Sequence, residues 1–284
     1  MPSVYAVPVT GVDFNRVGRP QVHHELSRLL GHGSEDWSLR SSPEHQVGSG
    51  NLEVGVLTEK LAGRLPRALA VGTELHFVGA KLAQTAVVTG PPVQVCRTDW
   101  ADLAVPFAGG RPVRSWDVTF QTPACTHPGV HYFPLLDGAS VFQSLLAAWR
   151  RAVLKDWAPR GSESLDPANR YMAAVCSQYG AALASLPKGL ALAGKQWDRD
   201  TRLDLHVSAI RGHTEIYRIG QNSNRPAIEL HGFVGSLRLV SVDDELAALA
   251  DCLLRFGEFA GVGAKTSYGF GSMAVSPWRP SSDR

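Results

Sequence analysis

The sequence GVGAKTSYGFG, residues 261–271, carries four glycines in eleven positions together with Lys265. Glycine permits positive φ angles and the close approach of another backbone, and successive exposed backbone N–H groups form a concave anion site. Lys265 adds a positive charge, and the hydroxyls of Thr266 and Ser267 add hydrogen-bond donors. The stretch therefore predicts a loop that binds a phosphate group. Its candidate binding residues are Gly261, Gly263, Lys265, Thr266, Ser267, Gly269 and Gly271.

Two well-known phosphate loops do not match this pattern. A dinucleotide-binding fingerprint follows a strand and opens a helix, whereas here a predicted helix over residues 243–259 comes first and a predicted strand over residues 272–277 follows. Lys265 also lacks the glycine spacing of a Walker loop. A plain turn between helix and strand stays the alternative, with Tyr268 or Phe270 either stacking on a base or filling the core beneath.

Hydrophobic periodicity predicts the strands and helices in the rest of the chain. Predicted strands lie at residues 3–9, 52–58, 73–82, 86–96, 114–121, 203–210, 214–219 and 229–240. Predicted helices lie at Pro20–Leu30, Thr98–Phe107, 138–157, 168–184 and 243–259. Residues 31–51 are rich in Gly, Ser and His and are predicted to be a loop.

The order of these elements predicts the fold class. Strands and helices follow one another in the same plan twice, which is typical of an α+β protein with two tandem ferredoxin-like domains of the RNA-recognition type. The Gly-Gly-Arg-Pro turn at residues 109–112 predicts the boundary, giving domains 1–110 and 111–284. Fold alone does not establish function.

Composition excludes several classes of protein. The chain has 284 residues, is 44% hydrophobic and has a net charge of +2, so it is neither disordered nor a polybasic binder. It has no apolar run of the length that a membrane helix needs and no signal-peptide pattern. Four cysteines without a Cys-x-x-Cys pair suit reduced thiols, so we expect a cytoplasmic protein that does not bind a membrane.

Three blocks resemble the CRISPR-associated precursor-RNA endoribonucleases of the RAMP superfamily. The first is LLRFGEFAGVGAKTSYGFGSMAV at residues 253–275, which is similar to the closing signature of that family. The second is VTFQTPACTHPGVHYFPLLDGASVFQSLLAAW at residues 118–149, and the third is ELHGFVGSLRLV at residues 229–240. The resemblance covers most of residues 115–284, and the first 110 residues match only in outline.

The resemblance implies a function. It implies cleavage of precursor CRISPR RNA within its repeats, without a metal or other cofactor, through attack of the RNA's own 2′-hydroxyl. The products would be guide RNAs with a 2′,3′-cyclic phosphate (or 3′-phosphate) and a 5′-hydroxyl end. CRISPR repeat RNA is then the partner, and a homodimer or contact with effector-complex subunits is compatible with it. Two alternatives stay open: a non-catalytic RAMP subunit that binds guide RNA, and a protein that binds a small phosphorylated ligand.

Such a reaction needs a general base, and histidine suits that role because its pKa lies near neutrality. In the family the base is often a histidine in or just after the first helix, and four histidines lie in that zone. They are His45, His32, His24 and His23. The family's usual Leu-His pair is replaced here by Leu39-Arg40. This leaves open which of the four histidines is the base, and also whether any histidine is. Arg40 is the nearby candidate for binding RNA phosphate.

One other group of side chains contains residue types that bind metals. Cys125, His127 and His131 lie within seven positions of the sequence. A structural zinc site needs four ligands, and no fourth ligand is evident. We therefore expect no metal site there.

Overall fold

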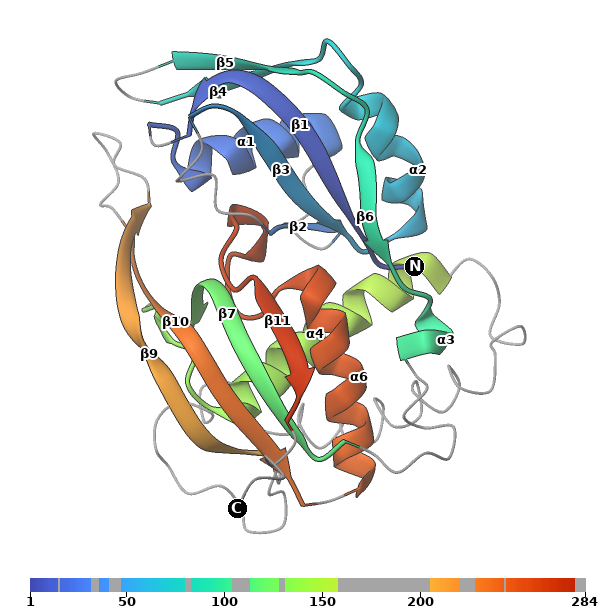
Figure 1. Cartoon of the computed structure of the whole chain (residues 1–284), viewed down its shortest axis with the longest axis vertical. Helices are drawn as coiled ribbons and strands as arrows, with labels where there is room; N and C mark the ends of the chain where they lie inside the picture. The colour runs from blue at the N-terminus through green and yellow to red at the C-terminus, as the bar shows by residue number, and fades with distance from the viewer. Residues whose placement is uncertain are drawn as a thin grey trace, which may run out of the picture.

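The computed structural model describes residues 1–14, 16–31, 36–40, 47–79, 83–103, 113–127, 131–157, 205–219, 228–242 and 244–278. Two antiparallel sheets lie one above the other, each with helices packed against it (Figure 1). The N-terminal elements are β1 (Ser3–Asp13), α1 (Arg19–Leu30), β2 (Trp37–Leu39), β3 (Val47–Val56), α2 (Glu59–Ala68), β4 (Glu74–Val78), β5 (Ala83–Val88), β6 (Val93–Arg97) and α3 (Trp100–Leu103). The C-terminal elements are β7 (Ser115–Thr126), β8 (Phe133–Pro134), α4 (Gly138–Trp157), β9 (Leu205–Ile219), β10 (Ile228–Ser241), α6 (Asp244–Ala260), the short 3₁₀ helix η5 (Thr266–Tyr268) and β11 (Met273–Pro277).

The N-terminal sheet has the strand order β2-β3-β1-β5-β4, with β6 pairing to β1 as well. Its central strand alternates buried and less buried side chains, as a strand covered on one face should. Helix α1 buries Val22, Leu26 and Leu30 against this sheet, and these three positions recur at the spacing of one helix face. Pro20 occupies the first turn of the helix, where its missing N–H costs nothing.

The C-terminal sheet has the strand order β11-β7-β10-β9 and carries α4 and α6. Its core combines leucine and other aliphatic side chains with several aromatic rings, and the Trp149 and Phe256 rings meet edge to face at 5.2 Å between centroids. The indole of Trp116 is fully buried and donates to Asp251 Oδ1 at 2.8 Å, which satisfies both polar groups inside the core. None of the helices in the described part of the chain combines the length and hydropathy that a membrane span requires.

The two halves are packed against each other. Val4, Leu57 and Trp100 of the N-terminal half belong to the core cluster of the C-terminal half. At the same interface Ser38 Oγ donates to the carbonyl oxygen of Phe259 at 2.6 Å. The relative position of the halves is therefore held by apolar burial and by a buried hydrogen bond.

The predicted fold class is confirmed, and so are the helices that begin near Pro20, at residue 138 and near residue 243. The long strand predicted over residues 229–240 is also confirmed as β10. The predicted helix over residues 168–184 and the boundary at residues 109–112 lie outside the described residues. The division into domains 1–110 and 111–284 stays a prediction.

Three predictions of elements were wrong in detail. The single strand predicted over residues 86–96 is two strands, β5 and β6, because Gly90, Pro91 and Pro92 interrupt it. The two strands predicted over residues 203–219 are one continuous strand, β9, which stays paired with β10 through Gly212. The loop predicted over residues 31–51 contains β2 and the start of β3, because Trp37 and Leu39 are buried beside β3.

Candidate functional site

The glycine-rich loop is anchored to strand β7 by backbone hydrogen bonds. Ala264 N donates to the carbonyl oxygen of Cys125 at 2.7 Å, and Gly271 N donates to that of Pro123 at 2.9 Å. The two ends of the loop are joined because Val262 N donates to the carbonyl oxygen of Gly271 at 2.9 Å. The loop is therefore a closed and well-supported turn, and its inner side belongs to the core.

Two of its glycines are required by close packing. Gly271 has φ of +67°, and a Cβ there would overlap the carbonyl oxygen of Val262 and lie 2.9 Å from its carbonyl carbon. Gly263 has φ of +88°, and a Cβ there would overlap the carbonyl oxygen of Cys125. The glycines thus allow backbone to approach backbone within the protein. Whether they also allow the approach of RNA stays a prediction.

Lys265 has an unusual backbone conformation within the loop. This residue has φ of 62° and ψ of 33°, and among the described residues no other non-glycine side chain sits at positive φ. Such a conformation costs about 1–2 kcal/mol for an L-residue, so the fold maintains it against strain. Within the described part of the chain, the amides of Lys265, Thr266 and Ser267 donate to no backbone carbonyl. Ser267 is only 1% exposed, so its hydroxyl is less accessible than the half-buried side chains of Lys265 and Thr266.

One stripe of helix α1 packs against this loop. Arg19 is 3% exposed, donates from Nη1 to the carbonyl oxygen of Gly269, and lies 5.0 Å from the centroid of the Phe270 ring. One turn later, the His23 ring stacks on the Tyr268 ring with 3.8 Å between centroids and 19° between planes. The Lys265 ammonium lies 5.0 Å from the centroid of the same Tyr268 ring. An imidazole and a cation therefore meet on one tyrosine.

The hydrogen bonds of His23 define its tautomer. Nδ1 lies 3.2 Å from the carbonyl oxygen of Ser267, and a carbonyl can only accept, so Nδ1 carries the proton in this bond. In the neutral ring, Nε2 then holds the lone pair that a general base needs. The hydroxyl of Ser27 lies 3.4 Å from Nε2. Trp37 of β2 packs near the ring with 5.6 Å between centroids, so the imidazole is held on several sides.

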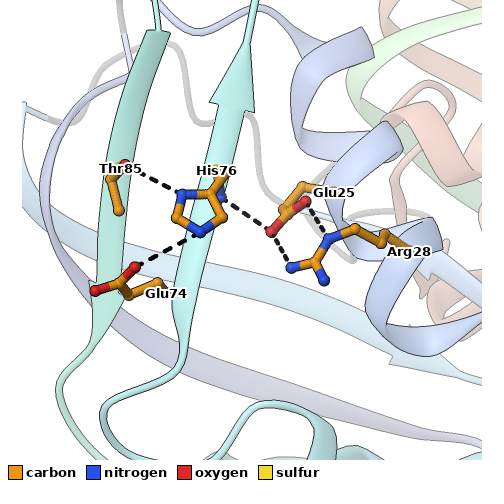
Figure 2. A network of polar contacts seen from close by, with 5 residues as sticks. All are labelled: Glu25, Arg28, Glu74, His76 and Thr85. Atoms are coloured by element: carbon orange, nitrogen blue, oxygen red, sulfur yellow. Dashed lines mark hydrogen bonds and ion pairs between the residues drawn. The ribbon is translucent and has the colours of Figure 1, made fainter.

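The orientation of α1 is fixed from its other side by Glu25 (Figure 2). This carboxylate is 2% exposed and accepts from Arg28 Nη2 at 2.7 Å and from the backbone amide of His76, in β4, at 2.9 Å. Burial alone raises the pKa of Glu25, but these hydrogen bonds outweigh burial and hold that pKa below its ordinary value. Since Glu25 joins α1 to strand β4, it sets the position of His23 two residues earlier.

The structure separates the other candidates. His24 is exposed, while His32 and His45 lie outside the described residues. The guanidinium of Arg40 lies between the two halves, where Nη2 donates to the carbonyl oxygen of Met273 at 2.9 Å and Nη1 is buried without a partner among the described residues. Burial lowers the pKa of Arg40, while the carboxylates of Glu258 and Glu53 oppose that shift. Contact between Arg40 and RNA phosphate stays a prediction.

Cys125, His127 and His131 were considered as a metal site, but their side chains lie in different surroundings. The Cys125 thiol faces the carbonyl oxygen of Ala264 at 3.9 Å, and burial raises its pKa to about 12. A thiol must lose its proton to bind a metal, which this environment opposes. Across the described residues, no three His, Cys, Asp or Glu side chains are grouped so as to hold a metal ion.

Sequence reasoning missed Arg19 and Trp37. Arg19 precedes a proline at the start of a helix, where an arginine is ordinarily solvated, so no local signal announces its burial. Trp37 lies in the stretch predicted to be a loop. The available signal of its burial was the residue type itself, because a tryptophan is a large apolar side chain and this one lies in a polar stretch between leucine-containing segments.

Residues 118–273 match the protein-family model described as CRISPR-associated endoribonuclease Cas6, a span of more than half of the 284 residues. Solved structures agree in fold. A Cas6 product complex has a TM-score of 0.63 and 18% identity, covering 97% of this chain and 99% of the other. A second Cas6 product complex has a TM-score of 0.61 and 21% identity, with coverage of 97% and 99%. Cas6 from Thermus thermophilus has a TM-score of 0.55 and 19% identity, with coverage of 97% and 98%. No curated protein matches the sequence in a direct comparison.

Proposed function

The chain belongs to the Cas6 family of CRISPR-associated endoribonucleases, and from that premise we propose that it cleaves precursor CRISPR RNA within its repeats without a metal ion. The observation that best supports this assignment is the contact of His23 and Lys265 with the same tyrosine, at the loop that the family signature contains. It places an imidazole and a positive charge against the same aromatic ring. Both are needed to cut a phosphodiester without a metal.

The proposed reaction is an internal transfer. A base removes the proton of the 2′-hydroxyl, the 2′-oxygen bonds to phosphorus, and the bond from phosphorus to the 5′-oxygen breaks. The departing 5′-oxygen takes up a proton, so the products carry a 2′,3′-cyclic phosphate and a 5′-hydroxyl. The charge that develops on the phosphate is stabilised by Lys265 and by the amides of Lys265 and Thr266, which donate to no backbone carbonyl within the described residues.

The general base is one of three histidines. His23 has its tautomer defined and is stacked beside Lys265 through Tyr268, so it is the base favoured by the described geometry. His32 and His45 remain candidates for the general base, because the family resemblance implies that role for a histidine just after the first helix. His24 is exposed and makes none of these contacts, so it serves as the matched control.

The test of the function is a cleavage assay in EDTA with end-labelled repeat RNA. Cutting at a single position, with a cyclic phosphate on the upstream product, is the expected result. Tight binding of RNA that stays intact would replace this proposal with a non-catalytic RAMP subunit. Failure to bind any RNA would favour the small phosphorylated ligand instead.

Variants then identify the base. We expect His23→Ala, His32→Ala or His45→Ala to reduce the rate of single-turnover cleavage by about 10²-fold or more while RNA affinity is kept. His24→Ala should cleave at the wild-type rate. If all four variants cleave normally, a histidine base is wrong and the RNA conformation itself carries the reaction.

Lys265 is tested separately through salt dependence. For single strands, log K falls with log salt concentration by about 0.7 for each phosphate that a cation neutralises. We expect Lys265→Ala to weaken binding and reduce that slope by about 0.7, and Lys265→Arg to keep both. An unchanged slope in Lys265→Ala would remove Lys265 from the RNA-binding surface.

A further inference from the structure

A second stacked pair of rings lies just beyond the end of β7, the strand to which the glycine-rich loop is hydrogen-bonded. His127 follows the end of β7 and stacks on the Tyr132 ring with 4.1 Å between centroids and 28° between planes. Tyr132 is 8% exposed and belongs to a small buried cluster with Cys125, Leu230 and Phe270. His127 is exposed. An exposed imidazole is thus held flat against an immobile aromatic ring, which supports one of its faces and leaves the ring accessible to solvent.

This pair is connected to the loop by short links. Cys125, two residues before His127, accepts a hydrogen bond from Ala264, which directly precedes Lys265. Burial raises the pKa of Tyr132, and the nearby ionisable groups of Cys125 and Tyr268 raise it further, so the Tyr132 hydroxyl is close to the loop. The two stacks, His23 on Tyr268 and His127 on Tyr132, therefore both lie close to the loop that carries Lys265.

Base stacking is the chemistry that fits an exposed, backed ring. Every nucleobase has an aromatic face, and stacking on aromatic side chains is a main source of affinity for unpaired nucleotides. A backed ring loses little side-chain freedom when a base is added to it, so less of the stacking free energy is lost to ordering. A metal ligand does not explain the arrangement, because the neighbouring thiol is buried with its pKa raised to about 12.

We propose that His127, supported by Tyr132, is a base-stacking subsite that holds one unpaired nucleobase of the RNA next to the phosphate bound at Lys265. The subsite rests on the proposed function, since it takes a base from the same RNA chain. It contributes to binding and to the register of the strand, while proton transfer belongs to the histidines of the N-terminal half.

The experiment combines protein variants with an abasic scan of the repeat RNA. RNAs that each lack one base near the cleavage position are titrated against wild-type, His127→Ala and His127→Phe. The control is His131→Ala, because the exposed His131 ring meets the Phe133 ring edge to face, with 6.3 Å between centroids. We expect one abasic position to weaken wild-type binding by about tenfold, which corresponds to the loss of one stacked base. His127→Ala should bind intact RNA about tenfold more weakly and lose nothing further at that position.

His127→Phe should restore affinity and the effect of the abasic position, because phenylalanine keeps the stacking face but cannot titrate. At saturating RNA, single-turnover cleavage by His127→Phe should match that of the His131→Ala control, since both variants keep an aromatic face on Tyr132. If His127→Ala binds intact RNA as wild-type does, the subsite is wrong. If His127→Phe binds well but cleaves slowly, His127 transfers a proton and the stacking role is wrong. Failure of the wild-type protein itself to bind RNA would instead overturn the proposed function.

Discussion

Gly271→Ala should destabilise the protein more than the replacement by alanine of another glycine with a similar φ. Gly271 joins two backbone connections: its amide donates to the Pro123 carbonyl, and its carbonyl accepts from the amide of Val262, both at 2.9 Å. An added Cβ would overlap the carbonyl oxygen of Val262, which is backbone and cannot rotate away. The two ends of the loop must separate to admit the methyl group.

The magnitude follows from three contributions. Alanine at positive φ costs about 1–2 kcal/mol, and roughly 0.4–1 kcal/mol is recovered because alanine has less freedom than glycine in the unfolded chain. Separating the loop ends weakens two hydrogen bonds, each contributing about 1 kcal/mol. The expected loss is about 3 kcal/mol. Gly72→Ala is the matched control, because Gly72 has φ of +85° with nothing within 4 Å of its would-be Cβ. It should lose about 1 kcal/mol or less.

Thermal and chemical unfolding measure both variants. At roughly 2–4 °C per kcal/mol for a chain of this size, Gly271→Ala should lower Tm by about 6–12 °C and Gly72→Ala by no more than about 4 °C. RNA affinity, measured well below both transitions, should fall only in Gly271→Ala, because only that substitution distorts the loop. Equal Tm values for the two variants would refute the packing explanation of the glycine-rich loop.

Three further substitutions test the supports of the site, each by urea unfolding with the wild-type protein as reference. Because the pKa of Glu25 is lowered in the folded state, its contribution is complete above the ordinary pKa of 4.5 and is lost as pH falls. Glu25→Gln should therefore cost roughly 1.5–3 kcal/mol at pH 7 and progressively less toward pH 3, and a gap that does not change with pH would contradict this. Ser38→Ala removes the donor to the Phe259 carbonyl and should cost about 1–3 kcal/mol; a neutral effect would mean that solvent reaches that carbonyl. Trp116→Phe removes the indole donor to buried Asp251 and should cost about 1–3 kcal/mol at pH 7; a neutral effect would mean that Arg255, 3.7 Å from Asp251 Oδ2, satisfies the carboxylate by itself.

Much of the fold could be predicted from local patterns. The stripe of Val22, Leu26 and Leu30 is sufficient to place α1 and to say which side faces a sheet, because burial at 3.6-residue spacing needs no knowledge of distant residues. The wrong predictions concern elements that form only through contacts between residues far apart in the sequence, which local patterns do not reveal. β2 was missed because three residues between polar stretches form a strand only when β3 is beside them.

The chemistry of the loop could be predicted only in part. Glycine spacing and Lys265 predicted an unusual turn at residues 261–271. The structure has this turn, with a strained backbone at Lys265 and a tight closure at Gly271. The sequence could not show that Gly263 serves packing against Cys125, since that contact joins residues 138 positions apart. The positions of the candidate histidines relative to the loop are likewise decided by tertiary contacts. His23 and His24 are adjacent in sequence, yet only His23 meets the loop.

Helix α1 explains why the site depends on both halves of the chain. Val22, Leu26 and Leu30 face the N-terminal core, while Arg19, His23 and Ser27, also four residues apart, form a second stripe. Judged by residue type alone, this second stripe should face solvent. Instead Arg19 and Ser27 are buried and His23 is half-buried, because the stripe contacts the loop that follows α6. Neither half alone supplies both the imidazole and the cation, so substitutions at Arg19 and in the loop should be strongly non-additive in cleavage.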